Sequence, residues 1–299
     1  MAINLNPGTA PFRPEVWAAA LMGGYTKNLV YAQGNITNRN YLGQIQQIGD
    51  TVHVSSLSTP TIRPYDAQED LVIEDLSMSD NSYKIDQGSY FAFRVEDVEQ
   101  VQAAGPLRDP ATKQAATSLR DDVDTYIANL IKSGAGSKLG TSEVIDDDPT
   151  RQGGKTAFRT LVKLSEALND NSVPTTGRYV IVGPKFHSAL LMDPRFTRVD
   201  ASGNEDGLRN GIVGRAVGFD VLMSNNVPST AGRELISAGV PDAVAFTEQI
   251  NKVEMQREER RFADLVKGLL IFGGAVFQPQ GLATADVSVV EPADPAPAA

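Results

Sequence analysis

The chain lacks cysteine altogether, which excludes disulfide bonds and thiolate-bound metal sites. Only two histidines are present, His53 and His187, so a nucleophile–histidine–acid triad would depend on one of them. His53 lies in a predicted strand with no acid nearby, and His187 lies in the helix predicted after Pro184. We therefore predict no catalytic residue and no enzyme activity.

Phosphate, nucleotide and metal motifs are also missing. Gly154-Lys155-Thr156 resembles the end of a phosphate-binding loop, but the loop requires a glycine where Pro149 stands. This stretch is better interpreted as a helix start. Gly134 to Gly140 lacks the spacing of a dinucleotide fingerprint, and Asp146-Asp147-Asp148 lacks the spacing of an EF-hand. We expect no cofactor and no metal site.

Concentrated positive charge and long apolar runs are absent as well. The net charge is −10, and the tightest basic group, Arg257, Arg260 and Arg261, is interleaved with glutamates. Proteins that bind nucleic acid tightly usually carry a concentrated basic surface. The most apolar run, Gly268 to Phe277, is half the length of about 20 residues that a membrane helix needs, so we predict a buried strand there.

What is present begins with a short amphipathic helix. Pro14 suits the first helical position, and Trp17, Leu21 and Tyr25 recur at four-residue spacing. After it, alternating residues from Thr51 to Phe91 predict a long β-hairpin of two runs of roughly ten residues, with Asp80-Asn81-Ser82 as a turn within its second half.

This predicted hairpin is the most informative feature of the sequence. Its outer half, Arg63 to Lys84, is polar and has few large apolar side chains. A two-stranded ribbon is marginally stable in water when nothing covers it. We therefore expect the hairpin to lie on a neighbouring subunit.

The remaining pattern alternates helices and strands. A long helix is predicted from Asp109 to Ser133, with an apolar stripe and with Arg120, Asp121, Asp122 and Asp124 on its other faces. Gly134 to Gly154 is predicted to be a flexible connection. Further elements are a helix with Phe158, Leu161, Leu164 and Leu168, a strand at Tyr179–Val182, a helix through Leu190-Leu191, and strands near Val217–Met223, Ala243–Thr247, Lys252–Gln256 and Leu269–Phe277.

Four blocks in order give the chain a family resemblance. They are Phe12–Trp17 with Asn28–Tyr31, Asn38–Tyr41 leading to Gly49–Val52, Ile85–Val98, and Val253–Asp264 followed by Val266–Leu269. Together they resemble the major capsid (coat) proteins of tailed bacteriophages. The resemblance implies an α+β fold of the Hong Kong phage capsid type, which encapsulins share.

The resemblance also implies a division of the chain. The expected parts are an amino-terminal arm and helix (1–31), an extended-loop hairpin with its roots (32–98), a peripheral domain with a long spine helix (99–151), an axial α/β domain (152–250), closing strands shared by both domains (251–288) and a disordered tail (289–299). Glycines at 23–24, 134–140 and 153–154 are expected to act as flexible joints.

The implied function is self-assembly, as pentamers and hexamers, into an icosahedral shell around double-stranded phage DNA. Expected partners are other copies of the chain, a separate scaffolding protein, a portal at one vertex, a candidate decoration protein and packaged DNA bound without sequence specificity, but no membrane. The expected location is the virion, after assembly in the host cytoplasm. An encapsulin-type compartment shell is the alternative.

Eleven residues are predicted to form contacts between subunits, most of them on the hairpin. They are Arg63, Tyr65, Asp70, Glu74, Asp75, Met78, Tyr83, Lys84, Arg120, Asp206 and Arg209.

Overall fold

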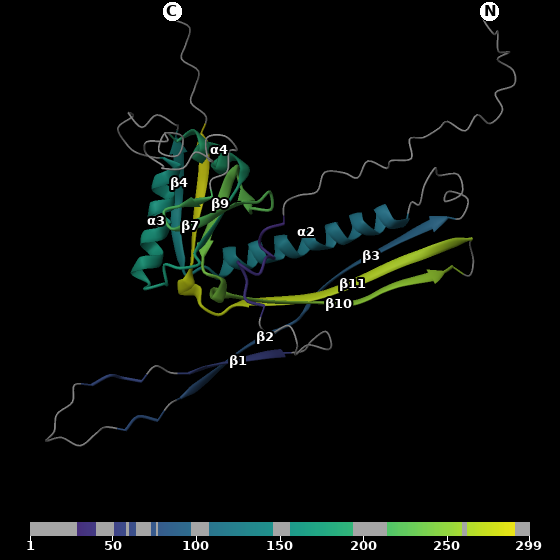
Figure 1. Cartoon of the computed structure of the whole chain (residues 1–299), viewed down its shortest axis with the longest axis horizontal. Coiled ribbons are helices and arrows are strands. Elements are labelled where there is room, and N and C mark those ends of the chain that lie inside the picture. The colour runs from purple at the N-terminus through teal and green to yellow at the C-terminus, as the bar shows by residue number, and fades with distance from the viewer. Residues whose placement is uncertain are drawn as a thin grey trace, which may run out of the picture.

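The computed structural model places a helix-and-sheet body beside a projecting hairpin (Figure 1). It describes residues 29–39, 51–57, 60–63, 73–75, 77–96, 108–145, 156–193, 214–258 and 262–290. The predicted first helix around Trp17 and the joints at Gly23-Gly24 and Gly153-Gly154 lie outside these residues.

One half of the body is built on the long helix α2, Arg108–Gly134, which runs along a three-stranded antiparallel sheet (Figure 1). The strands are β3 (Gln87–Glu96), β10 (Val244–Arg257) and β11 (Ala263–Val276), in the order β10-β11-β3. The predicted apolar stripe of the helix is confirmed, since Val123, Ile127 and Ile131 are buried. Asp124 was expected on another face, but it is also buried, because backbone and side-chain donors surround its carboxylate.

The other half is a mixed seven-stranded sheet. The order is β4 (Ser137–Ile145), β12 (Leu282–Val290), β9 (Arg233–Gly239), β5 (Tyr179–Val182), β7 (Phe219–Met223) and β6 (Arg215–Ala216), with β8 (Ser229–Thr230) on β9. Helices α3 (Ala157–Asp170) and α4 (Pro184–Met192) pack on one face of this sheet.

Two predictions in this half were wrong, and two strands were missed. β4 replaces part of the flexible connection predicted at 134–154, because it pairs in parallel with β12. β9 and β12 were not predicted. β12 also includes Val289 and Val290, which had been assigned to the disordered tail. The start of α3 is confirmed, since the hydroxyl of Thr156 caps it by accepting a hydrogen bond from the Arg159 amide at 3.3 Å.

Strand β5 joins the two halves into one body. Val180 and Val182 point into the core beneath α3 and α4, whereas Tyr179 and Ile181 point into the core around α2. All four residues are buried, as expected for a continuous apolar strand covered on both faces. The two halves therefore share a central strand.

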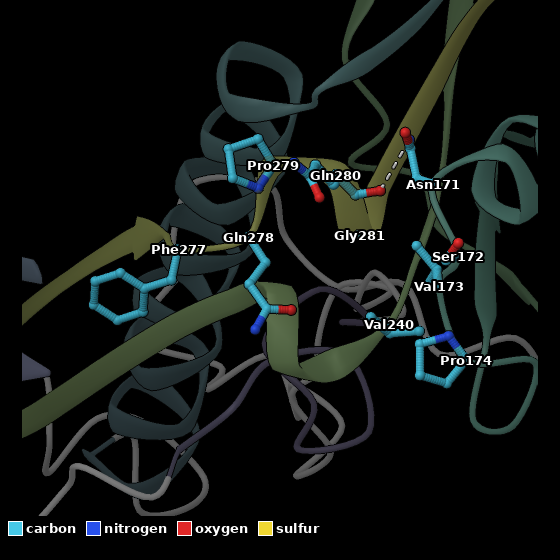
Figure 2. Close-up of a pocket in the computed structure, with 10 residues that line it drawn as sticks. All are labelled: Asn171, Ser172, Val173, Pro174, Val240, Phe277, Gln278, Pro279, Gln280 and Gly281. Atoms are coloured by element: carbon cyan, nitrogen blue, oxygen red, sulfur yellow. Dashed lines mark hydrogen bonds between the residues drawn. The ribbon is translucent and has the colours of Figure 1, made fainter. Parts of the chain in front are cut away.

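The chain crosses between the sheets at a tightly packed junction that borders a groove of about 300 Å³ (Figure 2). The short 3-10 helices Pro241–Ala243 and Pro279–Gly281 lie side by side here, and Asn171 donates a hydrogen bond to the Gln280 carbonyl at 3.3 Å. A Cβ at Gly136 would lie 2.6 Å from the Pro279 carbonyl oxygen. Gly136 thus permits close packing, and the flexible joint predicted there was wrong.

The hairpin predicted from Thr51 to Phe91 is confirmed as far as Lys84, but its last residues, Gln87–Phe91, lie in β3 and pair with β11. β1 (Thr51–Leu57) pairs antiparallel with β2 (Met78–Lys84), from Thr51 opposite Lys84 to Leu57 opposite Met78. Seven paired residues give about 24 Å of ribbon at roughly 3.4 Å per residue. Asp80, Asn81 and Ser82 lie within β2 and do not form the predicted turn, because they pair with residues 53–55 of β1.

Candidate functional site

The outer part of the hairpin carries large apolar side chains that its own chain hardly covers. Ile62 is 95% exposed, Ile73 is 90% exposed and Met78 is 72% exposed. Burying such a side chain is worth about 1.5–3 kcal/mol relative to leaving it in water. These residues would gain that free energy only from contact with another molecule.

Polar contacts hold the two legs of the hairpin together beyond its strands. Glu74 accepts a hydrogen bond from the Thr61 amide at 3.1 Å and forms an ion pair with Arg63 at 2.8 Å. The Thr61 amide, followed by the Arg63 guanidinium, lowers the pKa of Glu74 below its usual range. These contacts position Ile62 and Ile73 on neighbouring legs of one ribbon.

The root of the hairpin's second leg is buried in the body. The hydroxyls of Tyr83 and Thr247 share a hydrogen bond at 2.5 Å, and the Tyr83 ring meets Phe277 edge-on at 5.7 Å. Ile85 is also buried, and its Cα would lie 2.9 Å from a Cβ placed on Gly273. Tyr83 therefore packs within its own chain and is not exposed for contact with another copy.

The segment that leads into the first leg is fixed on the same strand, β10. Asn38 forms a parallel bridge with Ala245, and Arg39 pairs with Glu248 at 2.8 Å. The Arg39 guanidinium also donates to the Ala32 carbonyl and lies 5.4 Å from the centre of the Phe246 ring.

Asp124 anchors the same segment to α2. Its carboxylate accepts hydrogen bonds from the Ala32 amide at 3.0 Å and from the Asn226 side chain at 3.1 Å. Burial raises the pKa of Asp124, while these hydrogen bonds oppose the rise. Both backbone polar groups of Ala32 are thus bound, the amide by Asp124 and the carbonyl by Arg39.

The structure divides the eleven predicted contact residues into three groups. Arg63, Glu74, Asp75, Met78, Lys84 and Arg120 are exposed, the first five of them on the hairpin. Tyr83 is buried, and Tyr65, Asp70, Asp206 and Arg209 lie outside the described residues.

The prediction missed Ile62 and Ile73, the most exposed apolar side chains in the described part of the hairpin. Ile62 is a single apolar residue between Thr61 and Arg63, and Ile73 ends the apolar run 71–73, which indicated a strand. An isolated isoleucine in a polar stretch is the signal that could have found the first.

In the described part of the chain, no group of three or more His, Asp or Glu side chains could hold a metal ion. His187 is half-buried on α4, where burial lowers its pKa. None of the helices described is long and apolar enough to cross a membrane.

Comparisons with known proteins place the chain in a family. The family model described as "Phage capsid protein" matches residues 80–285. A solved structure from Mycobacterium phage Che8 is 29% identical, with 93% of this chain and 98% of that chain covered, at a TM-score of 0.76. No curated protein matches.

More distant structures share the fold. The capsid of cyanophage P-SCSP1u is 14% identical over 93% of each chain, at a TM-score of 0.73. The capsid of Ralstonia phage GP4 is 12% identical, over 99% of this chain and 100% of that one, at a TM-score of 0.66.

These matches cover most of the chain and confirm both the predicted α+β fold of the Hong Kong phage capsid type and the predicted resemblance. The chain belongs to the phage capsid protein family and serves as a phage major capsid protein.

Proposed function

We propose that this protein assembles as pentamers and hexamers into an icosahedral shell around double-stranded DNA, and that its hairpin binds a second copy of the chain. The exposure of Ile62 and Ile73 on a projecting ribbon supports this proposal most directly. A ribbon of two strands is marginal alone and gains stability from a surface beneath it.

Repetition makes weak contacts sufficient in a shell. Each copy offers one hairpin and receives another, so closing the shell multiplies the apparent affinity of each contact. The exposed residues Arg63, Glu74, Asp75, Met78 and Lys84 lie on the same ribbon as Ile62 and Ile73. We assign them, with Arg120, to contacts between copies, and exclude Tyr83 from that set because it is buried. Tyr65, Asp70, Asp206 and Arg209 remain in the proposed set from the sequence alone.

The proposal extends to partners and organisation. A separate scaffolding protein, a portal and a decoration protein are proposed partners, with assembly in the host cytoplasm and a final place in the virion. The net charge of −10 suits a container, since an inner wall that bound phosphate tightly would oppose movement of DNA. The six-part division of the chain, the absence of membrane partners and the absence of enzyme activity belong to the same proposal.

The test replaces Ile62 and Ile73 together by serine and measures the critical concentration for assembly by sedimentation and electron microscopy. We expect it to rise at least tenfold, since about 1.4 kcal/mol lost per contact already corresponds to a factor of ten. The matched control, with leucine at both positions, keeps the apolar surface and should assemble normally. Normal assembly of the serine variant would contradict the proposed role of the hairpin.

A further inference from the structure

We infer that residues 244–248, at the start of β10, form a mount that sets the direction of the hairpin and thereby the geometry of assembly. The mount is defined by Val244, Ala245, Phe246, Thr247 and Glu248. This inference rests on the proposed function, because it assumes that the hairpin contacts a second copy.

The second leg of the hairpin and the segment that precedes the first leg are both bound within this short stretch. The second leg reaches it through Tyr83, whose hydroxyl is hydrogen-bonded to Thr247. The segment that leads into the first leg reaches it through Asn38, at Val244 and Phe246, and through Arg39, at Glu248. Tyr83 and Arg39, which are more than forty residues apart in the sequence, therefore bind within the same five consecutive residues.

The contacts lie on opposite faces and on one edge of the strand. Side chains alternate along a β-strand, so Phe246 and Glu248 point to one face and Thr247 points to the other. Arg39 contacts Phe246 and Glu248, whereas Tyr83 contacts Thr247. Asn38 occupies the edge, donating to the Val244 carbonyl at 2.8 Å and accepting from the Phe246 amide at 3.1 Å. The start of β10 is thus contacted on both faces and along one edge.

The mount itself has little freedom to move. β11 pairs with it in continuous register from Val244 opposite Val276 to Glu248 opposite Phe272. Phe246 is fully buried in the core around α2, and Thr247 is 1% exposed. Gly273, opposite Thr247, has no side chain, and this lets the backbone of Ile85 cross close to β11.

The rigidity of the mount matters because a small rotation at the root of the hairpin produces a large displacement at its far end. Its paired strands extend about 24 Å, so a rotation of about 10° at the root moves the end of the strands by roughly 4 Å. A displacement of that size separates side chains from the atoms that they would contact, since apolar contacts require approaches of about 4–4.5 Å. A mutation in the mount that lets the hairpin change direction should therefore weaken assembly, although the residues that touch the second copy are unaltered.

The test uses the absence of cysteine to attach two spin labels, at Ser77→Cys near the hairpin and Lys163→Cys on α3. The width of the distance distribution between the labels, measured on unassembled protein, reports the range of orientations that the hairpin adopts relative to the body. We expect Tyr83→Phe and, separately, Glu248→Gln to widen it about twofold. In the unlabelled protein, each variant should raise the critical concentration for assembly at least threefold. Glu254→Gln is the matched control. Glu254 also lies on β10, and the substitution breaks only an exposed ion pair with Lys267 of β11, away from both legs.

Two outcomes would contradict the inference that the mount sets the direction of the hairpin. One is an unchanged distance distribution in both variants. The other is a widened distribution with wild-type assembly, which would show that aim does not matter. Neither depends on the serine variant at positions 62 and 73. If that variant assembles normally, the proposed role of the hairpin is contradicted. The width of the distance distribution between the labels would still report whether the mount holds the hairpin.

Discussion

Ile181 in strand β5 and Ile62 on the hairpin are the same residue type in opposite surroundings. Ile181 is fully buried in the core around α2, and Ile62 is 95% exposed. The first contributes its apolar surface to the stability of the folded chain. The second leaves that surface in water and can contribute only when another molecule covers it. The comparison separates what holds this protein together from what it offers to others.

The largest expected effect tests the buried side of this comparison. Ile181→Ala should lower the free energy of unfolding by about 2–5 kcal/mol, because it leaves a cavity at the strand that both halves share. Ile62→Ala should change it by less than about 0.5 kcal/mol, since that side chain has little to lose. Chemical denaturation of unassembled protein measures both. Equal losses would show that the hairpin packs on its own body.

The next effect concerns the polar anchor in the body. Asp124→Ala leaves the Ala32 amide and the Asn226 side chain without their buried acceptor, which should cost about 1–3 kcal/mol. Hydrogen exchange at the Ala32 amide should accelerate at the same time. Asp170→Ala, at the exposed end of α3, is the control and should leave both quantities unchanged. Unaltered exchange at Ala32 would mean that Asp124 does not hold this segment.

A smaller effect follows from the titration of Asp124. Burial raises its pKa in the folded chain, near Asp121, which shares Asn226, and near Tyr31, whose own pKa is also raised by burial. The folded chain therefore keeps this proton at pH values where the unfolded chain has released it. The contribution of Asp124 to the free energy of unfolding should fall as the pH rises from about 3.9, the usual pKa of aspartate, to the raised folded value. Asp124→Asn should remove this part of the pH dependence, and a slope identical to that of the wild type would contradict it.

The smallest effect lies on the exposed side of the comparison. Arg63→Met should leave the unfolding midpoint unchanged, because the Arg63–Glu74 pair is exposed to solvent. The pKa of Glu74, followed by carbon NMR, should rise only partly towards its usual value, since the Thr61 amide still lowers it. A complete return to the usual value would show that the legs are not joined through Thr61.

Local patterns predicted the elements whose own residues follow a clear periodicity. The stripe of α2, the apolar positions of α3 and the short strand β5 were all read from periodicity. Alternation also identified the hairpin, although Asp80–Ser82 resembled a turn because turn-forming residues prevail there. In β2 these residues are extended because residues 53–55 of β1 pair with them.

Other features depended on partners far away in the chain. β4 and β12 pair with each other across more than 130 residues. β4 lacks strict alternation, whereas in β12 Ala283, Ala285 and Val287 alternate with polar residues, a signal that the prediction missed. Asp124 resembled a solvated helix residue, since nothing near it in the sequence shows that the Ala32 amide will reach it across 92 positions. The role of Tyr83 likewise depends on Thr247, 164 residues away.

The sequence by itself determined the family, the long helix and the hairpin, because each follows from short-range periodicity or from the order of blocks along the chain. Only the tertiary structure decided which side chains face solvent and which face the chain's own core. Burial is a property of three-dimensional neighbours, and it assigned Ile62 and Ile73 to the surface and Tyr83 and Asp124 to the interior.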